Sequence, residues 1–300
     1  MPSLPRLEAP RWAPEPPVEM PPGRIVHVPG RGEFFLRDTG GNGPPVLLLH
    51  GWMFSADLNW WRTYGFLRDA GYRVLAMDHR GHGRGLRTHA PFRLTDCAAD
   101  AAALLREVGA APAIAVGYSM GGPIAQCMAR DHADAVTGMV LCATSTNWRD
   151  PRQRVLWSSM ALIRFWLGLA PDTLWRRGLR MAGFPDSPVT TWTTSELTRG
   201  SATDLAEAGN QLASFDSREW VGTLDRPAAV IVTTKDQGVP PGHQRDLARR
   251  LDAPVFEVQG DHGAAISAAR RFNPVLVSAL AAVQAAADGV APAADRAQSA

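Results

Sequence analysis

The sequence predicts an α/β fold, in which short apolar strands end in glycine-containing turns and are followed by helices. The clearest unit is the apolar run over residues 113–118, which leads directly into residues 117–121, Gly-Tyr-Ser-Met-Gly, and then into a helix-compatible segment. The runs over residues 46–49 and 73–77 end in similar turns, and the first of them suits a strand that is covered on both faces.

The composition excludes several classes of protein. The chain has 300 residues, of which 45 % are hydrophobic, so it can bury one large core or two smaller ones. A net charge of +2, with basic and acidic residues intermixed, gives no nucleic-acid footprint. No run reaches the roughly 20 apolar residues that cross a bilayer, and residues 1–23 lack the apolar core of a secretory signal. We therefore expect a cytoplasmic protein without a transmembrane segment, and its oligomeric state is left open.

The remaining elements follow in order along the chain. Residues 1–23 are rich in proline and predict a disordered arm, and residues 24–28 and 33–39 flank a Pro-Gly turn and predict a hairpin. Helices are expected over residues 57–70, 95–108, 243–251 and 272–286, strands over residues 137–143, 227–233 and 255–259, and a disordered tail over residues 288–300. Cys97, Cys127 and Cys142 lie in apolar segments without metal-type spacing, which indicates buried reduced thiols.

The segment around Ser119 has the strand, tight turn and helix order of a nucleophile elbow. Gly117 and Gly121 leave room for a serine in a strained backbone conformation. The alternative is an ordinary glycine-rich turn with Ser119 as a helix cap. A site for acyl transfer also needs two backbone N–H groups aimed at the oxyanion, and we assign these to Trp52 and Met120.

Three histidines lie in the turns after the first strands, and a structural role is favoured for each. His50 directly follows a strand, and His79 and His82 belong to a glycine loop over residues 78–85 that we expect Asp78 and Arg80 to hold. The order G-x-G-x-x-G is absent from this loop, so it does not predict a phosphate site.

Taken together, these motifs resemble the α/β-hydrolase superfamily, in particular serine esterases and lipase-like members with a helical cap. The motifs are His50-Gly51, Asp78-x-Arg80-Gly81-x-Gly83 and Gly117-x-Ser119-x-Gly121-Gly122. The resemblance implies an eight-stranded, mostly parallel sheet with helices on both faces and a triad in the order Ser, Asp, His. Many relatives have a small hydroxyl residue where this chain has Gly85, which leaves the side-chain bonding of that loop open.

Candidates for the acid and the base of this triad lie directly after the last two predicted strands. Asp236 follows the strand over residues 227–233, and His262 follows the strand over residues 255–259. In open α/β sheets the carboxyl ends of the strands are where sites are assembled. His262 would take the proton of Ser119, and Asp236 would hold the imidazole in the correct tautomer. Asp261 is a rival for Asp236, but its side chain points away from that of its neighbour His262.

Residues 147–223 lack the strand rhythm and carry tryptophans and leucines with helical spacing, so we expect them to form a helical cap between core segments 24–146 and 224–287. Its aromatic side chains either contact an apolar substrate or attach the cap to the core. The arginines of this segment could meet an anionic substrate or surface, although a solvated helix face is the more ordinary interpretation. Substrate contacts are assigned to five residues: Trp52, Met53, Tyr118, Trp157 and Val239.

The function predicted from the sequence is hydrolysis of a small-molecule carboxylic ester with an apolar acyl or ring portion, through an acyl-enzyme on Ser119. The mechanism needs no cofactor, and no cluster of side chains predicts a metal. The alternatives are a cofactor-free perhydrolase, a hydrolase of carbon–carbon bonds, or a ligand-binding relative without turnover. Relatives with an aspartate nucleophile are disfavoured because residue 119 is serine.

Overall fold

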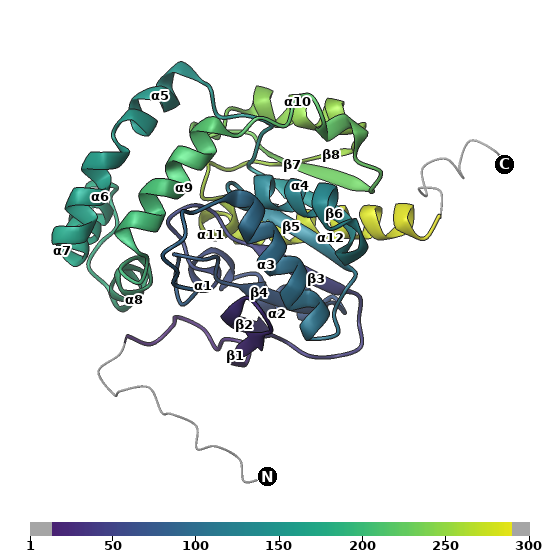
Figure 1. The fold of residues 1–300 in the computed structure, drawn as a ribbon, viewed down its shortest axis with the longest axis horizontal. Helices are drawn as coiled ribbons and strands as arrows, with labels where there is room; N and C mark the ends of the chain where they lie inside the picture. The colour runs from purple at the N-terminus through teal and green to yellow at the C-terminus, as the bar shows by residue number, and fades with distance from the viewer. Residues whose placement is uncertain (1–13, 290–300) are drawn as a thin grey trace, which may run out of the picture.

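The computed structural model describes residues 14–289, and within them one eight-stranded sheet has the strand order β1-β2-β4-β3-β5-β6-β7-β8 (Figure 1). The strands are β1 (Gly23–Val28), β2 (Gly32–Asp38), β3 (Pro45–Leu49), β4 (Arg73–Met77), β5 (Ala113–Tyr118), β6 (Val136–Cys142), β7 (Ala228–Thr233) and β8 (Val255–Val258). Strands β3 to β8 pair with one another in parallel. Strand β2 pairs antiparallel with both β1 and β4. The predicted hairpin and mostly parallel sheet are confirmed.

Helices cover both faces of the sheet. The two sets are α1 (Ala56–Trp60), α2 (Tyr64–Asp69), α11 (Ala264–Ser267) and α12 (Ala269–Ala287) on one face, and α3 (Leu94–Glu107), α4 (Gly121–Asp131) and α10 (Pro241–Leu251) on the other. Alternate residues of β3 enter the two cores, with Leu47 and Leu49 in one and Val46 and Leu48 in the other. This alternation explains why a central strand is apolar at every position.

Two predictions about the connecting segments need correction. The single helix expected over residues 57–70 is two helices, because the chain turns at Trp61 and the N–H of Thr63 donates to the carbonyl of Trp60. Of the arm expected over residues 1–23, residues 1–13 lie outside the described part of the chain. The described remainder is attached to the core, since Met20 packs on apolar side chains and the carbonyl of Pro22 accepts from the N–H of Asp38.

The C-terminal end follows the prediction as far as it is described. Helix α12 ends at Ala287, and residues 290–300 of the expected tail lie outside the described part. Over residues 14–289, none of the helices combines the length and the apolar character that crossing a membrane requires. The three cysteines are buried and free, and burial raises the pKa of the Cys127 thiol to about 12.

A group of helices lies between β6 and β7, beside the sheet in Figure 1, and we call it the cap. It consists of α5 (Pro151–Ser158), α6 (Met160–Leu169), α7 (Pro171–Met181), α8 (Pro188–Leu197) and α9 (Ala202–Ser214), and short 3-10 turns lie outside it at Ala133–Ala135 and Val221–Thr223. Helix α9 joins the core through Ala208 and Leu212. Trp192 of α8 packs edge to face on Trp61, so this tryptophan attaches the cap to the body.

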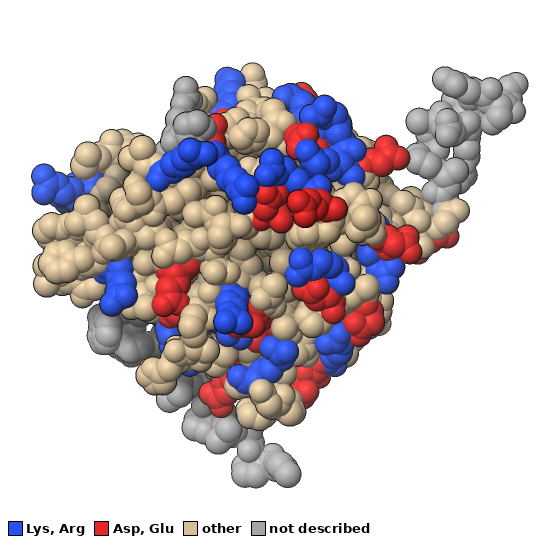
Figure 2. Space-filling model, turned by 45° about the horizontal axis from the view of Figure 1, so that its top comes forward, with Lys and Arg blue, Asp and Glu red and all other residues tan. Residues whose placement is uncertain are grey.

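Charged side chains of both signs cover the body. Figure 2 shows blue and red groups beside one another over the body on the face that it presents. Many of these are exposed ion pairs, for example Arg245 with Glu257 and Arg106 with Asp134. Exposed pairs of this kind contribute little to stability.

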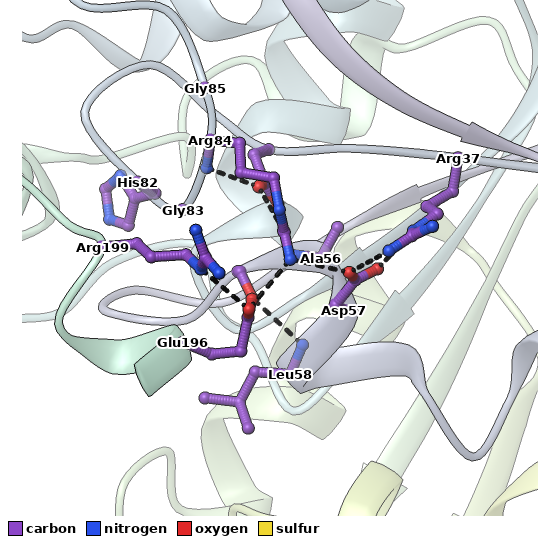
Figure 3. A network of polar contacts seen from close by, with 12 residues as sticks. Arg37, Ala56, Asp57, Leu58, His82, Gly83, Arg84, Gly85, Glu196 and Arg199 are labelled. Carbon is purple, nitrogen blue, oxygen red and sulfur yellow. Dashed lines mark hydrogen bonds and ion pairs between the residues drawn. The ribbon is translucent and has the colours of Figure 1, made fainter. Parts of the chain in front are cut away.

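A buried polar network joins the cap to the body (Figure 3). The guanidinium of Arg84 lies 3.0 Å from the Asp57 carboxylate, 3.2 Å from that of Asp78 and 2.8 Å from that of Glu196 in α8. Burial alone would lower the pKa of Arg84, but the attraction of these three carboxylates raises it. The hydroxyl of Ser55, which caps α1, donates to Glu196 at 2.7 Å. The network therefore fixes α8 against α1.

The loop after β4 is held by Asp78, as predicted, and by a residue that the sequence did not indicate. Asp78 accepts from the N–H groups of Ala56 and Arg84. Arg80 instead leaves the loop and pairs with Asp100 of α3. Arg87 donates to the carbonyls of Gly83 and Gly85, and a side chain at position 85 would collide with the carbonyl of His79. Glycine at position 85 is therefore required by space.

The three histidines in these turns are fully buried. The Nδ1 of His50 lies 2.8 Å from the carbonyl oxygen of Gly51, and its Nε2 accepts from the N–H of His79. This neutral ring braces the turn, which confirms the predicted structural role. Burial lowers the pKa of His50 to about 4 and that of His82 to about 3.

The network predicts a large loss of stability when its cation is removed. Arg84→Ala removes the cation that three buried carboxylates share, although Asp57 keeps Arg37 and Glu196 keeps Arg199. Removal of one member of a buried ion pair costs about 3–5 kcal/mol. Denaturant unfolding measures this loss. The control Arg68→Ala removes an exposed pair with Asp69 and is expected to change little. Equal effects of the two variants would contradict the assignment.

The buried histidines predict a loss of stability in acid. Their folded-state pKa values lie below the unfolded value of about 6.5, so their contribution is present above pH 6.5 and is lost as the pH falls toward 4, by about 1.4 kcal/mol per pH unit for each group. Urea unfolding between pH 7 and pH 5 checks the slope. His82→Asn is expected to reduce it, and His27→Gln, at an exposed position, is expected to keep it. A wild-type stability that does not change over this range would refute the interpretation.

Candidate active site

Ser119 stands at the sharp turn between β5 and α4 with a left-handed backbone, φ 52°. Its N–H donates to the carbonyl of Cys142, and its carbonyl accepts from the hydroxyl of Thr144 at 2.8 Å and from the N–H of Gly122 at 2.9 Å. A non-glycine residue in this conformation is strained and persists only where its surroundings hold it. These three hydrogen bonds, together with the packing of β5 and α4, keep the backbone of Ser119 in this conformation.

The two elbow glycines are needed for space, as the sequence predicts. A Cβ at Gly117 would collide with the carbonyl of Gly121, and a Cβ at Gly121 would collide with the carbonyl of Leu49 in β3. Helix α4 therefore approaches the sheet as closely as its backbone allows. The alternative interpretation, in which Ser119 caps the helix, does not fit, because Met120 occupies the N-cap position and makes no side-chain bond.

The structure brings together the three residues predicted as nucleophile, base and acid. Ser119 Oγ lies 2.9 Å from His262 Nε2, and His262 Nδ1 lies 2.8 Å from Asp236 Oδ2. Asp236 follows β7 and His262 follows β8, so each side chain comes from the carboxyl end of its strand. The Asp236 side chain is fully buried, and that of His262 is 38 % exposed.

The carboxylate of Asp236 is fixed by donors on every side. Its Oδ1 accepts from the N–H groups of Gly238 and Val239, both at 2.8 Å, and its Oδ2 accepts from the hydroxyl of Thr233 at 2.8 Å. The amide of Gln244 on α10 adds a longer bond of 3.3 Å. A carboxylate that accepts several hydrogen bonds keeps one orientation.

The rival Asp261 has a different role. Its Oδ1 accepts from the N–H of Gly263, at the start of α11, at 2.9 Å and from the hydroxyl of Ser267, at the end of α11, at 3.2 Å. Asp261 therefore shapes the loop that carries His262, and the carboxylate that contacts the His262 ring is that of Asp236.

The turn after β3 lies beside the elbow. A Cβ at Gly51 would lie 3.4 Å from the Cβ of Ser119, and the N–H of Gly51 is bonded to the side chain of Asn59. Trp52 and Met53 follow, and Met53 has a positive φ of 66°. The backbone N–H groups of Trp52 and Met120, on the two turns that flank Ser119, stay the predicted oxyanion donors.

An apolar cavity of about 620 Å³ opens beside His262. Its walls come from α1, from the cap and from the loops after β7 and β8. The apolar lining consists of Phe54, Leu58, Trp61, Leu179, Phe184, Val189, Leu197 and Ile266, and polar groups include Arg62, Thr190, Thr193, Gln237, Asp261 and Ser267. A pocket of this size and character suits a ligand with a substantial apolar portion.

The five residues assigned to substrate contact do not line this cavity. The side chain of Trp52 is bonded through Nε1–H to the carbonyl of Leu205 in α9, and its ring lies 5.4 Å from that of Trp157. This pair joins the turn after β3 to the cap. Met53 is half-buried at a turn. Trp52, Met53 and Trp157 therefore lie outside the lining of this cavity, and their contact with a substrate stays a prediction.

Tyr118 and Val239 hold the reacting groups instead of lining the cavity. Tyr118 is 3 % exposed, and its hydroxyl donates to the carbonyl of His262 at 2.9 Å. Burial raises the pKa of this phenol well above its usual value, so it stays a donor. Val239 is 1 % exposed, its N–H donates to Asp236, and its carbonyl accepts from the amide of Gln244. Their burial follows from their positions inside and directly after strands.

The sequence analysis did not identify three residues that hydrogen-bond to Ser119 or Asp236, namely Thr144, Thr233 and Gln244. Thr144 and Thr233 stand at or just beyond the ends of β6 and β7, which is a signal that could have identified them. Gln244 lies eight residues beyond Asp236, and no local pattern relates the two. Over residues 14–289, no group of three or more His, Cys, Asp or Glu side chains could hold a metal ion.

Comparison with known proteins agrees with this fold. The sequence model of a family described as "alpha/beta hydrolase fold" matches residues 44–269. A pimeloyl-[acyl-carrier protein] methyl ester esterase of Chromobacterium violaceum is 33 % identical over 257 residues, which are 81 % of this chain and 96 % of that protein. A non-heme haloperoxidase of Rhodococcus erythropolis is 29 % identical over 73 % of this chain and 84 % of its own length.

Solved structures show the same fold. The enol-lactonase of Burkholderia xenovorans superposes with a TM-score of 0.73 at 24 % identity, over 86 % of this chain and all of that one. The family match, the sheet order and the serine at the sharp turn after β5 lead to one conclusion: the chain belongs to the α/β-hydrolase family.

Proposed function

We propose that the protein is a serine hydrolase that cleaves a carboxylic ester with an apolar acyl or ring portion through an acyl-enzyme. The observation that carries the proposal is the chain of contacts Ser119 Oγ to His262 Nε2, 2.9 Å, and His262 Nδ1 to Asp236 Oδ2, 2.8 Å. Nucleophile and base within hydrogen-bond reach, with the base oriented by a third group, are the geometry that activates a hydroxyl.

The contacts support a definite sequence of proton transfers. Asp236 is an acceptor, so His262 carries its proton on Nδ1 and directs the lone pair of Nε2 at the Ser119 hydroxyl. Nε2 takes that proton as Oγ attacks the carbonyl, and the N–H groups of Trp52 and Met120 stabilise the oxyanion. The imidazolium then protonates the leaving alkoxide. A water molecule, deprotonated by Nε2, releases the acid from Ser119.

The cavity supports a substrate with an apolar acyl or ring group. Its lining is mostly aliphatic and aromatic, and it lies beside His262, where the acyl or leaving group would be held. The relatives support ester or lactone chemistry, because one is named a methyl ester esterase and a structural neighbour an enol-lactonase. We also propose a reducing location, the cytoplasm, for a chain whose three thiols are buried and free.

Perhydrolysis is a second candidate activity. It is favoured by the relative named a non-heme haloperoxidase, which aligns with 73 % of this chain. Hydrogen peroxide would then attack the acyl-enzyme in place of water and release a peracid, and no other residue would need to change. Peracid formation from the same ester in the presence of peroxide distinguishes the two, and a ligand-binding protein would give no burst of product from either.

Replacement of the nucleophile is expected to abolish covalent chemistry. Ser119→Ala should lose labelling by a fluorophosphonate and should lower ester turnover by at least about 10³-fold. A panel of nitrophenyl esters graded by acyl length gives the rates. The matched control Ser267→Ala removes a hydroxyl at the rim of the same cavity and should keep both signals. Labelling that persists in Ser119→Ala would sink the proposal.

Two acidic residues near His262 allow a matched test of the acid. Asp236→Asn places a donor against His262 Nδ1 and favours the wrong tautomer, so kcat should fall by about 10⁴-fold, the magnitude known for serine proteases. Asp261→Asn keeps an acceptor oxygen in the α11 turn and should stay within a few-fold of wild type. Steady-state kinetics on one ester give kcat for both variants. A larger loss of kcat in Asp261→Asn than in Asp236→Asn would assign the acid to Asp261.

A further inference from the structure

Helix α6 has large apolar side chains on its solvent-exposed face as well as on its buried face. Met160 and Leu167 point inward, and α6 packs on α9. The outward residues recur at i, i+3, i+4 and i+7, and they are Leu162, Phe165, Trp166 and Leu169, with exposed fractions of 57, 59, 47 and 65 %. A surface helix normally has polar side chains there, so this second apolar stripe indicates a partner.

Helix α7, which packs against α6, extends this surface. Leu174 and Met181 lie at i and i+7 and are 38 % and 82 % exposed, and Arg177 stands on the same side of the helix at i+3. We call the apolar residues of both helices, Leu162, Phe165, Trp166, Leu169, Leu174 and Met181, the α6–α7 face. Its members include Trp166, and tryptophan is enriched at the boundary between water and lipid or protein.

The helices that carry this face have an excess of positive charge. Residues 160–181 contain four arginines and one acidic residue, a formal net charge of +3. Arg176 pairs with that residue, Asp172, and Arg180 pairs with Asp186. Within residues 14–289, the exposed Arg164 and Arg177 form no ion pair. In Figure 2 the outer end of the cap, at the left, is tan with separate blue groups.

We propose that the α6–α7 face docks the protein on an anionic lipid bilayer. A helix surface with aromatic and aliphatic side chains flanked by arginines is bound by such bilayers through apolar burial and attraction to the headgroups. The positive charge argues against a second copy of this chain as the partner that covers the α6–α7 face. A two-fold contact brings a patch against itself, so Arg164 and Arg177 of one copy would face the same arginines of the other.

Docking on a bilayer would also let an ester substrate enter the cavity from the lipid. This inference rests on the proposed function. Leu179, Phe184 and Val189 line the cavity, and Phe184 and Val189 are 55 % and 43 % exposed. They lie in α7, in the connection to α8 and at the start of α8, next to the α6–α7 face in the chain. Docking would therefore bring the cavity wall close to the bilayer, and an ester with a long apolar acyl chain could enter from the lipid.

Vesicle flotation with the full chain tests the docking. Phosphatidylcholine vesicles that contain phosphatidylglycerol should bind the protein, while pure phosphatidylcholine or high salt should release it. Arg177→Gln should weaken partitioning about fivefold, because each basic residue near such a surface contributes about 1 kcal/mol. Phe165→Ser with Trp166→Ser should abolish it. The controls Ile25→Ser and Arg249→Gln change exposed residues of β1 and α10 and should bind as wild type.

Three results would overturn the proposal: no binding to anionic vesicles, equal binding to neutral ones, or a dimer in light scattering that Phe165→Ser with Trp166→Ser dissociates. Circular dichroism of each variant verifies that it is folded. Ser119→Ala should bind vesicles like wild type, so the two proposals fail separately. Loss of docking with turnover intact refutes only the docking, and turnover intact in Ser119→Ala refutes only the nucleophile.

Discussion

The left-handed backbone of Ser119 is the constraint on which the rest of the site depends. A φ of 52° costs free energy for a residue with a side chain, and the fold compensates with bonds from Thr144 and Gly122 and with a bond to Cys142. The turn presents the hydroxyl above the carboxyl ends of the strands. Because β7 and β8 run parallel to β5, the loops that carry Asp236 and His262 emerge at the same end.

The cap supplies part of the wall of the cavity beside His262, and buried charge fixes α8 of the cap against the body. Glu196 of α8 is 2 % exposed and is bound by Arg84, by Arg199 and by the Ser55 hydroxyl that caps α1. Helices α1 and α8 both supply residues to the wall of the cavity. A buried charge pair favours one arrangement over others, because any other leaves a charge without its partner. The shape of the substrate pocket thus depends on contacts remote from the reacting atoms.

The sheet, most helices and the meeting of Ser119, His262 and Asp236 could be predicted from the sequence, because each depends on local patterns: apolar runs, glycines at the elbow, and polar residues directly after strands. Sequence reasoning failed where distant segments meet. Gln244 contacts Asp236 only because α10 packs on β7, and the cavity walls combine α1 with α8. Trp52 and Trp157 are large and apolar, which suggested substrate contact, but they pack on each other. Propensity cannot tell a cavity wall from an interior contact.

The most direct measurement is rapid-quench mass spectrometry of the protein mixed with a nitrophenyl ester of an apolar acid. If Ser119 is the nucleophile, the acyl group appears before steady state, on the peptide that contains residue 119, and disappears as water attacks the acyl-enzyme. An acyl adduct on a different side chain that forms and decays at the rate of turnover would contradict the account.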